Sequence, residues 1–223
     1  MCGIVGYTGK RAAQEIILAG LEKLEYRGYD SAGISLQGED GLDAVRAVGN
    51  LSHLDAAMHA SEGGVAVAAP PATTGIGHTR WATHGRVCEA NAHPHFDTDD
   101  RVHVVVNGIV ENYMELKQEL QEAGAEFTSE TDVEVIAHLI AEELGAGGID
   151  LPEAVRRTYL RLRGHYAFVA MCAAEPRVRR PRRAARSGCR RLGRTRGCSR
   201  PAWRCRPSHT RDIRASGARP GLD

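Results

Sequence analysis

The spacing of apolar residues predicts a strand, a helix and a second strand near the start of the chain. Residues 2–7 form an apolar run typical of a buried strand, and Ser31–Leu36 form another. Between them, apolar residues recur at helical spacing on one face up to about Gly28: Ile16, Ile17, Leu21 and Leu24.

The middle of the chain has a weaker pattern. Up to about residue 74 it predicts no regular element, and Pro70-Pro71 indicates a loop. Short strands are predicted at 75–79 and 102–106, with a polar, histidine-rich loop between them.

Three helices and a last strand are predicted after residue 110. Helical periodicity covers 112–123 and 132–144, and Pro152 begins a third helix that ends near Leu162. Thr131-Asp-Val-Glu134 has the pattern of a capping box for the second of these helices, and Tyr166–Met171 is an apolar strand. Because strands and helices are mixed without a regular βαβ alternation, we predict an α+β fold.

Charge divides the chain into two parts. The 223 residues carry a net charge of +1, and 42% of them are hydrophobic, which is enough for a buried core. Residues 177–223 contain sixteen arginines, no lysine and two acidic residues, so they carry +14 and leave about −13 on residues 1–176. Apolar periodicity ends beyond Glu175, so we expect a folded domain over 1–176 and a disordered tail over 177–223.

Two hypotheses account for the arginine-rich tail. Its composition is what a GC-rich coding sequence yields when it is read out of frame, so a frameshift near residue 177 is the first, and resequencing the locus tests it. The second is a nucleic-acid-binding arm, because arginines attract phosphates. Only Trp203 in the tail could stack on a base and no folded reader motif accompanies it, so we do not expect a nucleic-acid partner.

Neither a membrane span nor a secretory signal is indicated by the sequence. No run of 18 apolar residues exists, and we therefore expect a cytoplasmic protein without a membrane partner. The six cysteines contain no CxxC pair, so we expect reduced thiols and no zinc site.

Cys2 is a candidate nucleophile because of its position. Cysteine is small enough for removal of the initiator methionine, which would expose an α-amino group on the residue that carries the thiol. With a reference pKa of about 7.7–8.0, that amine is partly neutral at cellular pH and can act as general base. One residue would then supply both nucleophile and base.

Six sequence blocks, in order, carry a resemblance to a known family: CGIVGY from residue 2, LEYRGYDSAGI from 24, GHTRWATHG from 77, NAHPH from 91, NGIVEN from 107 and SETDVEVIAH from 129. Residues 2 to about 171 resemble the glutaminase domain of the isomerizing glutamine:fructose-6-phosphate aminotransferases, or glucosamine-6-phosphate synthases. The resemblance implies a class II glutamine amidotransferase with the four-layer α/β/β/α sandwich of N-terminal-nucleophile hydrolases, built from antiparallel sheets. It also implies that full-length members are homo-oligomers.

The resemblance assigns the oxyanion hole to Asn107 and Gly108. Attack of Cys2 on the side-chain amide of L-glutamine creates an oxyanion that needs donors about 3 Å away, here the Asn107 amide and the Gly108 N–H. The alternative is that Asn107-Gly108 is only a turn that ends the strand at 102–106. Val106 stands where the family commonly has histidine, which removes one hydrogen-bonding side chain beside the predicted hole.

Four further residues are expected to bind glutamine by the same resemblance. The planar guanidinium of Arg80 suits the α-carboxylate, and Asp132 suits the α-ammonium group. For Asp132 the alternative is an acid placed in the first turn of a helix. Thr83 and His84 resemble additional substrate contacts, although a lone histidine is more often structural.

A lid and a gate complete the implied site. Arg27-Gly28-Tyr29-Asp30 resembles a loop that closes over glutamine, with Arg27 and Tyr29 as its lid residues, and Trp81 resembles a gate for ammonia. All of them could equally be packing residues. His93 and His95 form an H-x-H pair without a suitably spaced third ligand, so we expect no metal, and the reaction needs no cofactor.

The chain departs from the family after Met171. No sugar-phosphate isomerase half is recognisable, so fructose 6-phosphate would be a partner only through that missing half. Two other functions remain: another class II amidotransferase, linked to phosphoribosylpyrophosphate or asparagine synthesis, and an inactive, truncated binding module. Cys88 and Cys172 lack the glycine-flanked elbow that a Cys-His-Glu amidotransferase would need.

Overall fold

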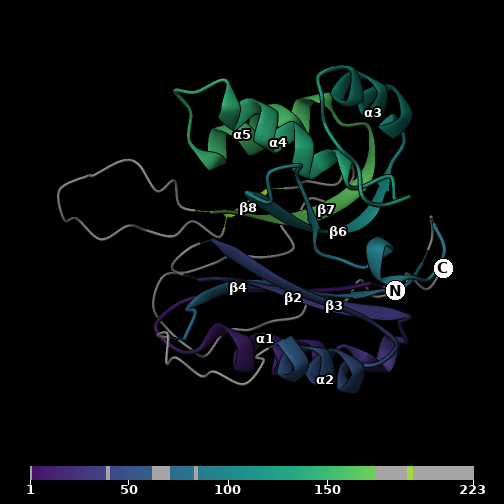
Figure 1. Ribbon diagram of the computed structural model, residues 1–223, viewed down its shortest axis with the longest axis vertical. Coiled ribbons are helices and arrows are strands. Elements are labelled where there is room, and N and C mark those ends of the chain that lie inside the picture. The colour runs from purple at the N-terminus through teal and green to yellow at the C-terminus, as the bar shows by residue number, and fades with distance from the viewer. Residues whose placement is uncertain (1, 39–40, 62–70, 83–84, 174–189, 193–223) are drawn as a thin grey trace, which may run out of the picture.

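The computed structural model describes residues 2–38, 41–61, 71–82, 85–173 and 190–192. These residues form two antiparallel four-stranded sheets that face each other between two layers of helices (Figure 1). The order of layers is therefore helix, sheet, sheet, helix, as the resemblance implied.

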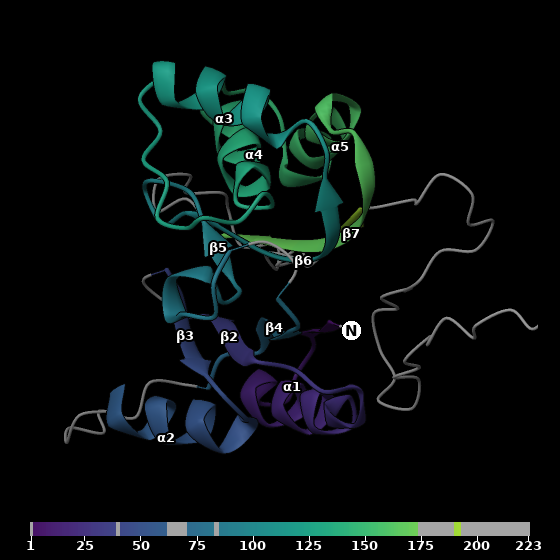
Figure 2. The same ribbon diagram turned by 90° about the vertical axis from the view of Figure 1, so that its right-hand side faces the viewer.

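The first sheet has the strand order β1 (Gly3–Thr8), β4 (Thr74–Arg80), β2 (Ser31–Gln37), β3 (Leu42–Val48). Its outer face is covered by α1 (Ala13–Glu22) and α2 (Leu51–Ser61) (Figure 2). The central strands β4 and β2 are buried along nearly their whole length because one face meets the helices and the other meets the second sheet.

The second sheet has the order β5 (His95–Phe96), β6 (Val102–Val110), β7 (Gly164–Cys172), β8 (Arg190–Leu192). Three helices cover its outer face: α3 (Tyr113–Glu122), α4 (Val135–Gly145) and α5 (Leu151–Arg161). Single 3-10 turns occur at Glu25–Arg27 and Glu89–Asn91.

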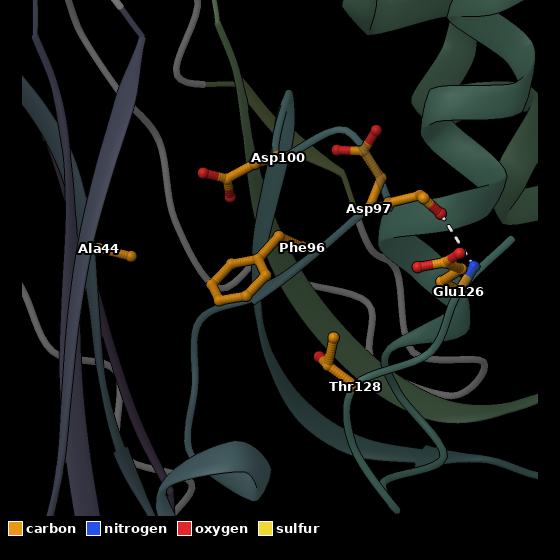
Figure 3. A pocket seen from close by; sticks show the side chains of 7 residues that line it. Ala44, Phe96, Asp97, Asp100, Glu126 and Thr128 are labelled. Carbon is orange, nitrogen blue, oxygen red and sulfur yellow. Dashed lines mark hydrogen bonds between the residues drawn. The ribbon is translucent and has the colours of Figure 1, made fainter.

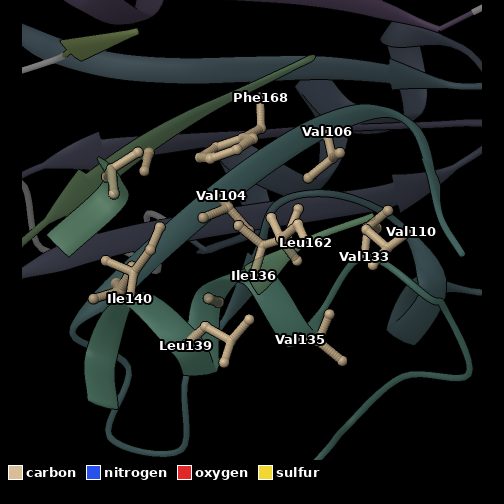
Figure 4. Packing of buried hydrophobic residues seen from close by; sticks show 14 of the residues in the cluster. Val104, Val106, Val110, Val133, Val135, Ile136, Leu139, Ile140, Leu162 and Phe168 are labelled. Atoms are coloured by element: carbon tan, nitrogen blue, oxygen red, sulfur yellow. The ribbon is translucent and has the colours of Figure 1, made fainter. Parts of the chain in front are cut away.

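Three apolar clusters hold the layers together. One packs α1 and α2 on the first sheet around Ile17, Leu21 and Leu54. A larger one packs α4 and its neighbours on the second sheet, where Ile136 lies among residues of β6 and β7 (Figure 4). A small cluster that includes Ile76 joins the two sheets.

Glycines on β4 set the distance between the first sheet and α1. A Cβ atom at Gly75 would lie 2.8 Å from the Ile17 side chain, and one at Gly77 would lie 2.4 Å from it. Both distances are below van der Waals contact, so the helix packs directly on the glycine backbone.

The sequence pattern identified most elements but missed β3, α2 and the two-residue strand β5, which lies in the predicted histidine-rich loop. β3 is an edge strand with only two buried residues, Leu42 and Ala47, and α2 buries Leu54 and Met58. Sparse burial gives sparse apolar periodicity, which is why the pattern there was weak.

Three details of the prediction were wrong. Thr131–Glu134 is not a capping box, because α4 begins at Val135 and the Glu134 carboxylate bonds to Thr128 and Ser129 instead. The strand predicted at 102–106 continues to Val110, so residues 107 and 108 are not a turn. Finally, residues 190–192 of the predicted disordered tail pair with β7 as β8.

Candidate active site

Cys2 lies immediately before β1, beside the end of β4. The main-chain N–H of Trp81 donates a hydrogen bond to Cys2 Sγ (3.3 Å), and the thiol lies 3.7 Å from the Trp81 carbonyl oxygen. Burial raises the pKa of the Cys2 thiol above 9.0, against the opposing effects of the Trp81 hydrogen bond and the Arg80 charge. The resting group at neutral pH is therefore a thiol, and its attack on a carbonyl requires a base.

Arg80 ends β4 and is 4% exposed. Its guanidinium lies 3.7 Å from an Asp30 carboxylate oxygen and donates to the carbonyl oxygens of Gly85 (3.4 Å) and Arg86 (3.5 Å). These distances are long for hydrogen bonds of an arginine, whose bonds to carboxylates are about 2.7–2.9 Å. A carboxylate ligand would offer Arg80 shorter bonds than these carbonyls do.

Asp30 is a site residue that the sequence pattern assigned only to the lid segment. Its carboxylate accepts a hydrogen bond from Ala82 N–H, approaches Arg80 and accepts from the Ser31 hydroxyl. Its main-chain N–H also donates to the Arg80 carbonyl (2.7 Å). Asp30 thus bonds to the residues before and after Trp81, and the main chain of Trp81 contacts the Cys2 thiol.

The predicted gate and lid differ in their surroundings. Trp81 is 52% exposed, and its ring lies over Gly28, where an added Cβ would be 2.9 Å from it. Tyr29 instead packs against the core of the first sheet, bonds to Glu25 and accepts from Leu51 N–H (2.7 Å). These contacts favour a packing role for Tyr29, while the side chain of Arg27 lies outside the described part of the chain.

Asn107 and Gly108 lie inside β6, opposite Ala167 and Tyr166 of β7. Asn107 is exposed, and Gly108 has φ = 140°, a region that favours glycine. A Cβ at Gly108 would lie 2.1 Å from the main-chain oxygen of His165, so no other residue fits there without displacing β7. The pair is a distorted strand segment with an exposed amide side chain.

The Val106 side chain belongs to the apolar cluster under α4 (Figure 4). Neighbouring residues of a strand face opposite sides, so this side chain lies on the opposite face from the Asn107 amide. The side chain at position 106 therefore contributes to the core of the second sheet.

Asp132 is 3% exposed and lies before α4, not within its first turn. One carboxylate oxygen accepts a hydrogen bond from Val110 N–H (2.7 Å), at the end of β6. The helix-dipole explanation of this residue is therefore wrong, because the carboxylate is directed to the strand that carries Asn107 and Gly108.

Glu134 organises the loop before Asp132. It is fully buried, and its two oxygens accept bonds from the N–H groups of Thr128 and Ser129, both 2.8 Å, and from their hydroxyls. Thr131 in turn contacts the Ser129 hydroxyl and His95 Nε2. The sequence contains this residue in SETDVEVIAH, but the capping-box interpretation concealed its role.

Three buried histidines contact one another in a row: His78, His93 and His95. The ring centroids of His78 and His93 are 4.0 Å apart, and those of His93 and His95 are 4.4 Å apart. Burial lowers the pKa of His78 and of His95 to about 3, and that of His93 well below 6.5, so all three are neutral at pH 7. Within the described ranges, no group of His, Cys, Asp or Glu is arranged to hold a metal ion.

Cys2, Arg80 and Trp81 lie at one end of the first sheet. Asn107 and Gly108 lie in β6, and Asp132 bonds to the last residue of that strand. β1 and β4 both contact β6 across the sheets. Thr83 and His84 lie outside the described residues.

A cavity of about 270 Å³ lies elsewhere, between β3, the end of β5 and the loop at 126–128 (Figure 3). Its acidic lining includes Asp97, whose carboxylate already accepts bonds from Arg101 N–H and Val102 N–H. No predicted site residue that the structure describes lines this cavity. None of the helices described here is long and apolar enough to cross a membrane.

Comparison with known proteins shows what the chain is similar to. Residues 78–183 match the family model of the glutamine amidotransferase domain. The chain is also 52% identical, over 178 residues, to the glutamine–fructose-6-phosphate aminotransferase (isomerizing) of Streptomyces coelicolor. The chain carries a glutamine amidotransferase domain. The match covers 80% of this chain and 28% of that relative.

The chain is also similar to a second isomerizing aminotransferase and to a solved amidotransferase structure. The isomerizing aminotransferase of a Nostoc species is 52% identical over 181 residues, which cover 79% of this chain and 28% of the relative. The solved structure of B. subtilis glutamine phosphoribosylpyrophosphate amidotransferase, complexed with ADP and GMP, is 27% identical with a TM-score of 0.60. It covers 77% of this chain and 35% of that chain, and confirms the predicted N-terminal-nucleophile hydrolase fold.

Proposed function

We propose that this chain hydrolyses L-glutamine to glutamate and ammonia through a γ-glutamyl thioester at Cys2. The observation that carries the proposal is the position of the Cys2 thiol, held by the main chain of Trp81 next to the buried Arg80. The Cys2 nucleophile and the Arg80 cation are thereby adjacent. Glutamine requires both, because it carries its reactive amide at one end and its α-carboxylate at the other.

In the proposed mechanism, Met1 is removed and the freed α-amine of Cys2 takes the thiol proton. Sγ then bonds to the side-chain carbonyl carbon of glutamine, and the negative charge passes to its oxygen. The Asn107 amide and the Gly108 N–H would donate to that oxyanion. Collapse breaks the C–N bond, and the protonated amine returns its proton to the departing ammonia.

Water then attacks the thioester carbonyl, loses a proton to the α-amine and releases glutamate and the Cys2 thiol. Arg80 would hold the α-carboxylate of the substrate by short, charge-assisted bonds. Asp132 would bind the α-ammonium group. Trp81 would limit the access of water and the exit of ammonia, because its exposed ring borders the lid segment at Gly28.

We further propose that the ammonia serves glucosamine 6-phosphate synthesis, with fructose 6-phosphate bound by a separate half. The Streptomyces coelicolor and Nostoc relatives are isomerizing aminotransferases at 52% identity, against 27% for the phosphoribosylpyrophosphate enzyme. This chain spans 28% of the length of each of these relatives. A cytoplasmic location suits a free thiol nucleophile, because reducing compartments keep thiols reduced.

Intact-mass spectrometry after treatment with a glutamine-analogue diazoketone tests the proposal. We expect a single adduct on a chain that lacks Met1, and none on Cys2→Ala. Cys88→Ala is the matched control and should label like the unmodified chain. Labelling that survives Cys2→Ala, or glutamine binding without glutamate release by a Met1-free chain, would overturn the mechanism.

A further inference from the structure

β6 loses its second neighbouring strand just before Asn107. In the β5–β6 ladder, His95 lies opposite Val104 and Phe96 opposite His103, and β5 contains only these two residues. The same register would place His93 opposite Val106. The main-chain N–H and C=O of Val106 therefore point to a position beyond the end of β5. Val106 is only 2% exposed, so these groups need partners within the protein.

Two histidine rings take the place of the missing strand. His93 Nδ1 accepts a hydrogen bond from Val106 N–H (3.3 Å), and His78 Nε2 lies 2.9 Å from the Val106 carbonyl oxygen. A carbonyl only accepts, so His78 must donate from Nε2–H. Buried main-chain groups left without partners cost about 1–3 kcal/mol each, which explains why polar rings are retained here.

Both rings are anchored on the first sheet. His78 belongs to β4 and is fully buried. The main chain of His93 lies against β2, since a Cβ at Gly33 would be 2.0 Å from the His93 carbonyl oxygen. The two rings contact each other and thus form one bridge from the first sheet to β6.

We propose that His78 and His93 are positioning residues that fix the peptide between Val106 and Asn107, and through it the oxyanion hole. The carbonyl bonded by His78 belongs to the same peptide as the Asn107 N–H. Rotation of this peptide would move the Asn107 side chain, and a misplacement of about 1 Å at a reacting centre costs about 100-fold in rate. The inference rests on the proposed role of Asn107 and Gly108.

The bond from Val106 N–H requires a neutral His93, because only an unprotonated Nδ1 can accept it. His78 donates from Nε2–H in either protonation state, but a neutral ring avoids a buried charge. A proton on His93 Nδ1 would face the Val106 N–H, and a second proton on His78 would place a charge between the sheets. Burial, the proximity of the other histidines and the charge of Arg80 all disfavour these protons. The bridge is therefore expected to hold throughout the pH range in which the enzyme is folded.

Kinetics of paired variants test the positioning role. His78→Phe keeps a ring but removes the donor, and should lower kcat for glutamine hydrolysis about 100-fold with KM changed less than about threefold. His78→Gln retains a donor and should recover at least about tenfold of that loss. His93→Phe and His93→Asn form the equivalent pair for the acceptor.

Alkylation of Cys2 by iodoacetamide separates positioning from general damage, because this reaction forms no oxyanion. Its rate, followed on the Cys2 peptide, should stay within about twofold in every variant. The matched control is His103→Phe, which removes another buried imidazole of β6, bonded to Ser35 and Asp100. Its kcat should stay within about twofold of the unsubstituted chain.

Hydrogen exchange gives a readout that does not depend on glutaminase activity. In His93→Phe, the Val106 amide should exchange at least about tenfold faster, while amides in the middle of β7 stay protected. Equal kcat losses in His78→Phe and His103→Phe, alkylation that falls in step with kcat, or unchanged Val106 exchange would overturn the inference. If the folded, Met1-free parent chain is alkylated at Cys2 but releases no glutamate, the proposed function is refuted instead. Hydrogen exchange of the Val106 amide would then still test whether His93 holds the main chain of β6.

Discussion

Glu134→Gln replaces one carboxylate oxygen by an NH2 group inside a fully buried network. In the native chain, one oxygen accepts from the Thr128 N–H and hydroxyl, and the other from the Ser129 N–H and hydroxyl. A glutamine presents a single oxygen, so one of the two main-chain N–H groups would face another donor. The hydroxyls can rotate to accept, but a main-chain N–H cannot.

The pKa of Glu134 gives the size of the effect. Burial acts to raise this pKa, but the nearby His138 ring and the bonds from Ser129 and Thr128 lower it from 4.5 to about 2. That difference corresponds to about 3 kcal/mol in favour of the folded carboxylate. An unsatisfied buried N–H costs about 1–3 kcal/mol, so the value from the pKa shift and the value from the lost hydrogen bond agree. We expect Glu134→Gln to lower the free energy of unfolding by about 3 kcal/mol at pH 7.

Urea denaturation followed by circular dichroism measures this loss. Because the folded pKa lies below the unfolded one, the carboxylate stabilises fully above about pH 4.5, and its contribution is lost as the pH falls towards 2. The difference between the two chains should therefore be constant from pH 7 to 5.5 and shrink below 4.5.

The control is Glu153→Gln, which removes a partly exposed carboxylate that bonds to Arg156 and Arg157. Salt at 1 M screens ion pairs that solvent reaches. It should therefore remove most of the small stability loss of Glu153→Gln and leave the stability loss of Glu134→Gln unchanged. A loss below about 1 kcal/mol for Glu134→Gln, or one that disappears in salt, would refute the reasoning.

Three further outcomes are expected. Gly108→Ala should lower glutamate release at least about 100-fold, because its Cβ would lie 2.1 Å from the His165 oxygen; a variant with a tenth of the activity would contradict this. Asp132→Asn should raise KM for glutamine at least about tenfold in steady-state kinetics, because it keeps an acceptor for Val110 N–H but removes the charge; an unchanged KM would argue against ammonium binding. The rate of Cys2 alkylation by iodoacetamide should still rise at pH 9, because burial raises the thiol pKa, and a plateau below pH 8 would contradict the burial argument.

The candidate site residues could be proposed from the sequence because they occur in contiguous blocks. Cys2, Arg80, Asn107 and Asp132 each stand in a short motif, and the resemblance supplied their roles. The contributions of Asp30, His78, His93 and Glu134 were not predictable from spacing. Each acts through a hydrogen bond to a main-chain group of another segment, and local periodicity carries no information about such partners.

The sequence by itself determined the α+β class, most strands and helices, and the two-part charge distribution, because apolar periodicity and composition are local properties. Only the tertiary structure decided that Asn107-Gly108 lies within a strand rather than a turn, since the pairing with β7 extends the strand to Val110. It also decided that Asp132 and Glu134 serve neighbouring segments instead of capping a helix. Buried polar groups must find partners across the fold, and the choice of partner is set by packing, not by the order of residues.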